Sequence, residues 1–255
     1  MARVYSANSP CERLKDIGVI FVQPLYEQNI GYIARCMKNF CLSELLLVKP
    51  RCSLGVESIR YAMHGADVIE KARVVDSFEE AIKEFDLVAC TTGVKGSGVL
   101  RRYLSPREAA EIIAGSTGRR AIVIGREDWG LTNEELSLCD LVVTIEANPD
   151  YPSLNASHAA VIVFYEIFNA LVRIPKPRVE RPRREEVEKL LEYIDLLGLE
   201  LGYDDARREK AKLIVRRLVA ETMFSALELR VLLGFFGDSL RKVKSCGERA
   251  HAWEA

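Results

Sequence analysis

The stretch from Ala121 to Glu166, AIVIGREDWGLTNEELSLCDLVVTIEANPDYPSLNASHAAVIVFYE, decides the fold of this chain. Its two short apolar runs, at 121–124 and 141–145, are typical of buried strands. Between them, Thr132 with a glutamate three residues later predicts the start of a capped helix. After the second run a polar loop leads into an apolar helix, which we expect over 158–172. The two loops that follow the strands are therefore candidate binding loops.

Upstream of this stretch the same alternation of strands and helices recurs. Short apolar runs predict strands over 17–23, 45–48, 73–75 and 87–91. Helical patterns cover 30–40, 56–66, 77–85 and 105–115. This order favours an α/β fold, a parallel sheet with helices on both faces. Ligands of such sheets bind in loops at the carboxyl ends of the strands, which here are 24–29, 91–98, 125–130 and 146–155.

The composition changes after Val172. The segment 173–184, RIPKPRVERPRR, holds three prolines among many basic residues and predicts an extended linker. Helical periodicity returns over 185–197, 207–220 and 226–243. We therefore predict an α/β domain over 1–172, a basic proline-rich linker over 173–184 and a small α-helical module over 185–255.

The charge of the chain limits how it can bind nucleic acid. The formal net charge of the 255 residues is -1, so RNA binding would need local basic patches. The linker supplies one candidate RNA-binding set, Arg173, Lys176, Arg178, Arg181, Arg183 and Arg184. A second cluster, Arg207, Arg208, Lys210, Arg216 and Arg217, falls on one predicted helix, where a solvated face with local ion pairs is the alternative explanation.

The seven cysteines are scattered and never spaced as Cys-x-x-Cys. We expect reduced thiols in a cytoplasmic protein, several of them buried as small apolar residues. No apolar run reaches the roughly 18 residues of a membrane span, and the N-terminus lacks a signal-type segment. These patterns predict a protein that has no membrane partner.

Several familiar site motifs do not occur in the sequence. It has no G-x-x-x-x-G-K-[ST] phosphate loop, no G-x-G-x-x-G after the first strand and no G-x-S-x-G turn. The three histidines do not pair with cysteines or carboxylates at metal-ligand spacing, so we expect no metal site. These absences disfavour an NTPase, a dinucleotide enzyme, a hydrolase of that type and a metalloenzyme.

Three segments taken together resemble one family. They are NIGYIAR at 29–35, IVIGREDWGLTNEEL at 122–136 and NPDYPSLNASHA at 148–159. Alone, each has a simpler explanation: a capped helix with a surface arginine, a strand-terminating turn with a local ion pair, and a helix cap. In this order they are similar to the three motifs of the TrmH-like ribose methyltransferases of the SPOUT superfamily. Spacing and C-terminal helices are most like the TrmJ branch, which modifies position 32 in the anticodon loop of tRNA.

The resemblance implies a fold and an activity. It implies a trefoil knot in the C-terminal part of the α/β domain, an obligate homodimer, and S-adenosylmethionine as methyl donor. The reaction would be 2′-O-methylation of the ribose of a cytidine, or also a uridine, in tRNA. The apolar helix over 158–172 is compatible with a partner on its free side. An rRNA methyltransferase of the same fold and a non-catalytic RNA-binding protein remain the alternatives.

The resemblance also implies roles for single residues. The implied cofactor-binding residues are Thr91, Thr92, Gly93, Gly125, Ile145, Ser153, Leu154 and Asn155. The implied catalytic residues are Arg35, Asn29, Glu127, Ser153 and Asn155, with Arg35 acting on the ribose 2′-hydroxyl. A guanidinium has a pKa above about 12, so we expect Arg35 to orient the hydroxyl rather than to act as its base. Trp129 is assigned no role.

Overall fold

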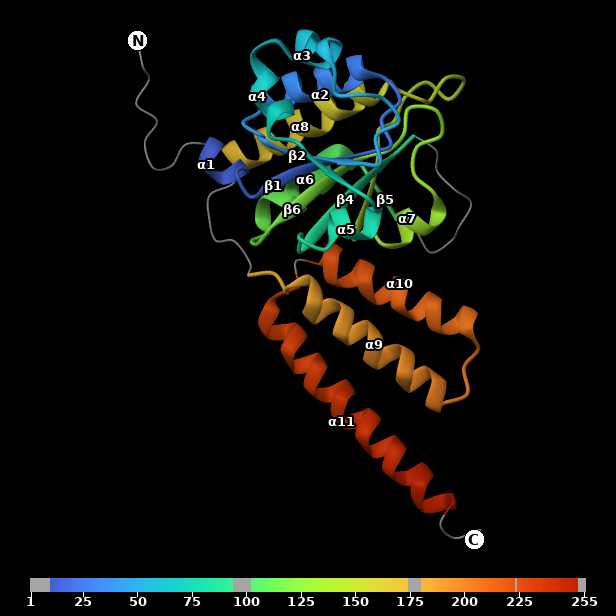
Figure 1. Ribbon diagram of the computed structural model, residues 1–255. Coiled ribbons are helices and arrows are strands. Elements are labelled where there is room, and N and C mark those ends of the chain that lie inside the picture. The colour runs from blue at the N-terminus through green and yellow to red at the C-terminus, as the bar shows by residue number, and fades with distance from the viewer. Residues whose placement is uncertain (1–9, 94–101, 174–179, 223, 252–255) are drawn as a thin grey trace. The chain divides into compact units, whose positions relative to one another are not determined.

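The computed structural model describes residues 10–93, 102–173, 180–222 and 224–251 (Figure 1). The chain divides into two compact units, Met1–Arg178 and Val179–Ala255. The first unit holds the sheet and the second consists of helices. The candidate site lies in the first unit.

A seven-stranded sheet, parallel throughout, forms the centre of the first unit in the order β3-β2-β1-β6-β4-β7-β5. Its strands are β1 (Ile17–Val22), β2 (Glu44–Val48), β3 (Arg73–Val75), β4 (Leu87–Thr92), β5 (Tyr103–Leu104), β6 (Arg120–Ile124) and β7 (Leu141–Thr144). The parallel α/β fold predicted from the sequence is confirmed. The edge strand β5 was not predicted, because a two-residue strand carries no readable period.

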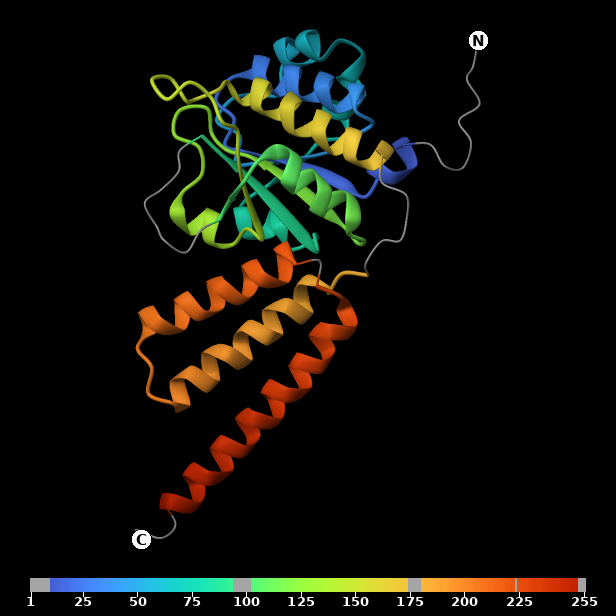
Figure 2. The same ribbon diagram turned by 180° about the vertical axis from the view of Figure 1, so that it is seen from behind.

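Helices cover both faces of this sheet. They are α1 (Pro10–Leu14), α2 (Glu27–Asn39), α3 (Val56–Ala62), α4 (Ala66–Glu70), α5 (Phe78–Ile82), α6 (Pro106–Gly115), α7 (Asn133–Ser137) and α8 (Ala156–Arg173), with a 3₁₀ turn at Met63–Gly65. In both views α8 lies between α2 and α6 (Figures 1 and 2). Residues of α5 and α7 pack with alternate strand residues, such as Ile20 and Val123, in one apolar cluster.

Local capping signals explain where several helices begin. Ser105 and Thr132 each form a capping box with the glutamate three residues on, as predicted. The prediction for α2 was wrong, because the helix begins at Glu27 and Asn29 lies inside its first turn. The residue at the cap position, Tyr26, offers no side-chain hydrogen bond there. Instead, the carboxylate of Glu127, about one hundred residues away, binds the backbone amides of Leu25 and Tyr26 just before the helix, which local sequence does not reveal.

Helix α2 packs unusually close to α3 at Gly31. A Cβ atom built on Gly31 would lie 2.5 Å from the carbonyl oxygen of Ser58, a distance that no side chain tolerates. The structure places the α3 backbone there.

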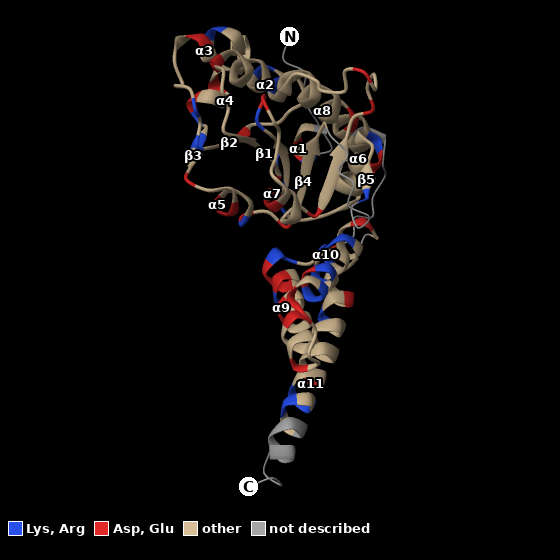
Figure 3. Cartoon of the chain, turned by 90° about the vertical axis from the view of Figure 1, so that its right-hand side faces the viewer, with Lys and Arg blue, Asp and Glu red and all other residues tan. Residues whose placement is uncertain are grey.

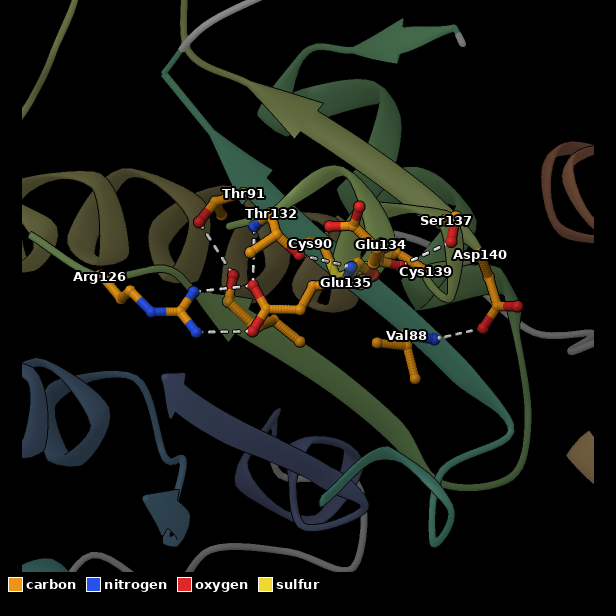
Figure 4. Close-up of a disulfide and its surroundings, with 11 residues drawn as sticks. Val88, Cys90, Thr91, Arg126, Thr132, Glu134, Glu135, Ser137, Cys139 and Asp140 are labelled. Carbon is orange, nitrogen blue, oxygen red and sulfur yellow. Dashed lines mark hydrogen bonds and ion pairs between the residues drawn. A yellow bond between two sulfur atoms is a disulfide. The ribbon is translucent and has the colours of Figure 1, made fainter. Parts of the chain in front are cut away.

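Two disulfides correct the prediction that all seven cysteines are reduced. Cys11 is bonded to Cys41. Cys90 is bonded to Cys139, and Figure 4 shows this second bond. The paired residues are 30 and 49 positions apart, so spacing could not show that the fold brings them together. The Cys90–Cys139 bond ties the centre of β4 to the segment between α7 and β7.

The second unit contains α9 (Arg184–Glu200), α10 (Asp205–Glu221) and α11 (Ala226–His251). Its apolar cluster includes Leu190 from α9, Val219 from α10 and Leu229 from α11. Ion pairs join acidic residues of α9 to arginines of α10, and Figure 3 shows acidic residues gathered on α9 and basic residues on α10. Across the described ranges no helix has both the length and the apolar character needed to cross a membrane.

Candidate functional site

The carboxyl ends of four adjacent strands, β1, β6, β4 and β7, carry the loops singled out in the sequence. Thr91, at the end of β4, donates a hydrogen bond of 2.9 Å from its hydroxyl to the carbonyl of Val123 in β6. A Cβ atom on Gly93 would lie 3.8 Å from Cα of Ser153. Gly93, the residue that follows β4, therefore lies beside the SLN segment before α8.

The loop after β6 is a tight turn closed by its own backbone. Arg126 and Gly130 exchange two backbone hydrogen bonds of 3.1 Å each, so residues 127–129 form the tip. A Cβ atom on Gly125 would lie 2.7 Å from the carbonyl carbon of Gly130. Only glycine at position 125 lets the turn fold back this closely.

Glu127, at that tip, holds the first turn of α2. Its carboxylate accepts hydrogen bonds from the backbone amides of Leu25, at 2.9 Å, and Tyr26, at 3.4 Å. It also accepts one of 3.1 Å from Nδ2 of Asn29. A carboxylate near a helix N-terminus is favoured by the helix dipole as well as by these donors. Glu127 therefore fixes both the start of α2 and the orientation of the Asn29 amide.

Asn29 also forms a hydrogen bond with the third motif segment. With its Nδ2 turned toward Glu127, its Oδ1 accepts a 3.1 Å hydrogen bond from Nδ2 of Asn155. Oδ1 of Asn155 then accepts from the amide and the hydroxyl of Ser157, at 2.8 and 2.7 Å. Asn155 thus caps α8. One continuous polar chain, which we call the Glu127–Asn29–Asn155 chain, joins all three motif segments.

The end of this chain is accessible. Ser153, Leu154 and Asn155 are exposed, whereas Asn29 is buried. The side chain of Asn155 is therefore held by buried partners, Asn29 and Ser157, and is itself accessible to solvent. Such a surface can bind a polar ligand without first ordering its own side chains.

Arg126 has a different role from the exposed local ion pair considered for its motif. It is buried, and its guanidinium makes two hydrogen bonds of 2.8 Å to the carboxylate of Glu135 (Figure 4). Its Nε donates to Oε1 of Gln23 at 2.9 Å. Sequence reasoning missed Gln23, whose only signal is a polar residue at the end of an apolar strand. Together these bonds lock the turn after β6 to α7 and to the end of β1.

Burial, which raises the pKa of Glu135, is outweighed by the hydrogen bonds from Arg126 and Thr132, so the pKa of this carboxyl lies below its ordinary value of 4.5. A carboxyl whose pKa is lowered by folding stabilises the fold above its unfolded pKa, and this contribution is lost as the pH falls through the folded pKa.

We expect Glu135→Gln to lower the free energy of unfolding by about 3–5 kcal/mol at pH 7, because the buried Arg126 loses its counter-ion. Urea unfolding at several pH values measures this. The difference from the wild-type protein should shrink as the pH falls below about 4.5, the ordinary pKa that Glu135 has in the unfolded chain, toward its lower folded pKa. The exposed neighbour Glu134, changed to glutamine, is the control. A difference that stays constant down to pH 3 would contradict this role.

Arg35 lies on the exposed side of α2, six residues after Asn29. Within the described parts of the chain its guanidinium makes no hydrogen bond or ion pair. The structure therefore joins Asn29, Glu127 and Asn155 by hydrogen bonds and places Ser153 beside Gly93, but leaves the Arg35 side chain toward solvent. In a site that acts on a bound anionic polymer, such an arginine is available to contact the substrate.

A cavity of about 450 Å³ lies beyond the carboxyl end of β7. Of the predicted cofactor residues only Ile145 lines it, together with residues of α6 and α8 such as Pro106 and Ile162. The polar chain described above is outside its lining. Among the residues that the structure describes, no group of three His, Cys, Asp or Glu side chains could hold a metal ion.

The predicted RNA-binding residues have different environments. Lys176 and Arg178 lie outside the described residues, and for Arg173 only the backbone, in α8, is described. Arg181 is buried and donates to the carbonyls of Val219 and Ala220, each at 3.1 Å, so it caps the end of α10 and is withdrawn as an RNA contact. Arg183 is exposed, and Arg184 is half-buried with Nε 3.7 Å from Glu188.

Fold and site together define a class: an α/β protein whose parallel sheet presents glycine turns and a fixed polar chain at the carboxyl ends of its strands. Residues 16–165 match the model of the SpoU rRNA Methylase family, and the chain belongs to this family.

The chain is similar to characterised relatives over most of its length. It is 34% identical over 225 residues to the tRNA (cytidine-2'-O-)-methyltransferase TrmJ of Methanocaldococcus jannaschii, covering 86% of this chain and 98% of that one. It is 31% identical to the tRNA (cytidine/uridine/adenosine-2'-O-)-methyltransferase TrmJ of Pseudomonas aeruginosa, covering 89% and 94%. The crystal structure of TrmJ from Z. mobilis superposes with a TM-score of 0.68 at 28% identity, covering 87% and 97%.

Proposed function

We propose that this protein transfers the methyl group of S-adenosylmethionine to the 2′-hydroxyl of a ribose in tRNA, at a cytidine or uridine in position 32 of the anticodon loop. The observation that carries the proposal is the Glu127–Asn29–Asn155 chain, because it unites the three motif segments in one accessible site. The tRNA methyltransferase names of the similar proteins support the choice of substrate.

The cofactor would lie against the loops after β4, β6 and β7. Thr91, Thr92, Gly93 and Gly125 would offer backbone groups, and Ile145, Ser153, Leu154 and Asn155 would close the site from the other side. The observed proximity of Gly93 to Ser153 supports this grouping. S-adenosylmethionine supplies an electrophilic methyl group on a positively charged sulfur, so these residues need only bind and orient it.

The acceptor hydroxyl must lie in line with that methyl group and lose its proton. Orienting the two reactants can contribute about 7–11 kcal/mol to lowering the barrier. Arg35 would hold the hydroxyl and a neighbouring phosphate with its planar donors and stabilise developing negative charge on the oxygen. Asn29, Glu127, Ser153 and Asn155 would position the reactants, and an RNA phosphate or water would take the proton.

The finer features of the fold and assembly belong to the same proposal. We propose a trefoil knot in the segment from β6 to α8, an obligate homodimer, and action in the cytoplasm. Exposed apolar side chains on α8, Ile162 and Tyr165, support a second copy on this helix. We also propose that the linker over 173–184 connects the methyltransferase domain to the helical module.

Basic residues of the linker would contact the tRNA backbone. We expect that neutralising Arg173, Lys176, Arg178 and Arg183 together weakens tRNA binding and flattens its salt dependence by up to about 0.9 in log–log slope per lost phosphate contact. Filter binding between 50 and 200 mM salt measures this. Arg181→Gln should instead lower stability, since Arg181 is buried. Unchanged salt slopes in the fourfold variant would rule out this contact surface.

Incubation with labelled S-adenosylmethionine and either tRNA or rRNA transcripts tests the proposal. The rRNA arm is needed because the family description names rRNA. Label in tRNA alone is the expected result. Label in rRNA alone would overturn the choice of substrate, and label in neither, with tRNA still bound, would favour a non-catalytic RNA-binding protein.

A further inference from the structure

Trp129 has a large aromatic side chain that is exposed to solvent. About 54% of its surface is exposed, although it sits in the tightly closed turn between Arg126 and Gly130. One side of the indole lies over the Arg126 guanidinium, whose carbon is 4.0 Å from the ring centroid. Since Arg126 is itself buried and fixed by Glu135 and Gln23, the indole rests on a rigid support.

The position of this indole relative to the candidate site is also fixed. Glu127, two residues before it, binds Asn29 and the start of α2. Asp128, next to it, is 3.3 Å from the guanidinium of Arg51 in an ion pair. All three residues at the tip of the turn are therefore anchored. A shift of the backbone at Trp129 would therefore also displace Glu127, the acceptor group of the Glu127–Asn29–Asn155 chain.

We infer that Trp129 is a base-stacking residue, on which an unpaired nucleobase of the RNA substrate rests while a nearby ribose is methylated. This inference rests on the proposed function. Unpaired bases of RNA loops are commonly bound on aromatic faces, and each stack contributes strongly to affinity. Because the indole is already oriented by Arg126, little conformational entropy is lost when a base joins it.

Stacking would give Trp129 a role in positioning rather than in base discrimination. Every nucleobase has a π-face, so the contact tolerates different bases. A cytidine and a uridine could both stack on the indole. The residue would place the loop nucleotide so that its ribose reaches the site beside Asn155. Loss of the Trp129 indole should therefore weaken tRNA binding and raise KM, with a smaller effect on kcat.

A second copy of this chain is the alternative partner that could cover the exposed indole of Trp129. The position of Trp129 favours RNA, because the indole lies on the same turn as Glu127, whose carboxylate binds Asn29 in the candidate site. Charge does not decide between the two occupants, since Arg126 is paired with Glu135 and Arg51 with Asp128.

The chain itself offers a direct probe. It contains two tryptophans, Trp129 and Trp253, so the full-length Trp253→Phe protein reports the emission of Trp129 alone. Titration with an unmodified tRNA transcript should quench this emission, with the same Kd that filter binding gives. No change in emission at saturating tRNA would overturn the inference.

Affinity provides the second readout. Trp129→Ala should weaken tRNA binding about 5- to 100-fold, the range that loss of one stacked base produces, whereas Trp129→Phe and Trp129→Tyr should retain most of the affinity. Thermal unfolding of the three variants checks that the turn still folds. Affinity of the alanine variant within twofold of wild type would overturn the inference. A concentration-dependent blue shift of Trp129 without RNA would do so too, by showing that a second copy covers it.

The same samples separate this inference from the proposed function. Methyl transfer to tRNA without quenching or loss of affinity would remove the stacking role and leave the methyltransferase. Quenching by RNA without methyl transfer to any tRNA would remove the proposed function and leave Trp129 as an RNA contact.

Discussion

Arg35→Ala is expected to lower kcat for tRNA methylation by about 10²–10³-fold, the loss typical of removing one donor that stabilises charge in a transition state. The fold should be unaffected, because Arg35 is exposed. Loss of such an arginine typically changes stability by less than about 0.5 kcal/mol. Single-turnover methyl transfer at saturating tRNA, with thermal unfolding in parallel, measures both quantities.

Arg35→Lys separates charge from geometry. Lysine keeps the positive charge but loses the planar pair of donors that can hold a hydroxyl and a phosphate at once. We therefore expect the lysine variant to remain strongly impaired. The exposed Arg60, changed to alanine, is the matched control and should keep wild-type turnover. Near-normal turnover of Arg35→Lys with a clear acidic limb in the pH profile would contradict bidentate orientation.

Glu127→Ala is expected to have the second-largest effect. It removes the acceptor of the Leu25 and Tyr26 amides and of the Asn29 side chain. The start of α2 would lose stability, by about 1–3 kcal/mol if the donors stay unpaired. The larger consequence should be a roughly 10²-fold loss of kcat, because Asn29 would no longer hold Asn155 in one orientation.

Two further variants test this explanation. Glu127→Gln retains one acceptor oxygen and should fall between wild type and Glu127→Ala in both turnover and stability. Glu134→Ala, on the exposed side of α7, should match wild type. If Glu127→Ala loses stability but keeps full turnover, the Glu127–Asn29–Asn155 chain is structural and does not position the reactants.

Local signals allowed much of the fold to be predicted. Ser105 and Thr132 mark their helix starts because each capping box is complete within four residues. Buried parallel strands such as β1 and β6 appear as continuous apolar runs, since both faces are covered. The loops that form the candidate site could be predicted from a further rule, because the carboxyl ends of parallel strands lie at one edge of the sheet.

Interactions between distant segments could not be predicted in the same way. The sequence does not show that Glu127 binds the backbone amides just before α2, or that Asn29 and Asn155 share a hydrogen bond across 126 positions. The same applies to the Cys90–Cys139 bond and to the pairing of Arg126 with Glu135. Each depends on strand order, and strand order is a property of the whole sheet.

The most direct test of the central claim is to map the methyl group. Unmodified tRNA transcripts are incubated with the full-length protein and labelled S-adenosylmethionine, and the labelled nucleotide is located after digestion. We expect one 2′-O-methylated cytidine or uridine at position 32, recognised by the resistance of the adjacent phosphodiester bond to alkali. Label on a base, or at tRNA positions outside the anticodon loop, would contradict the proposed reaction.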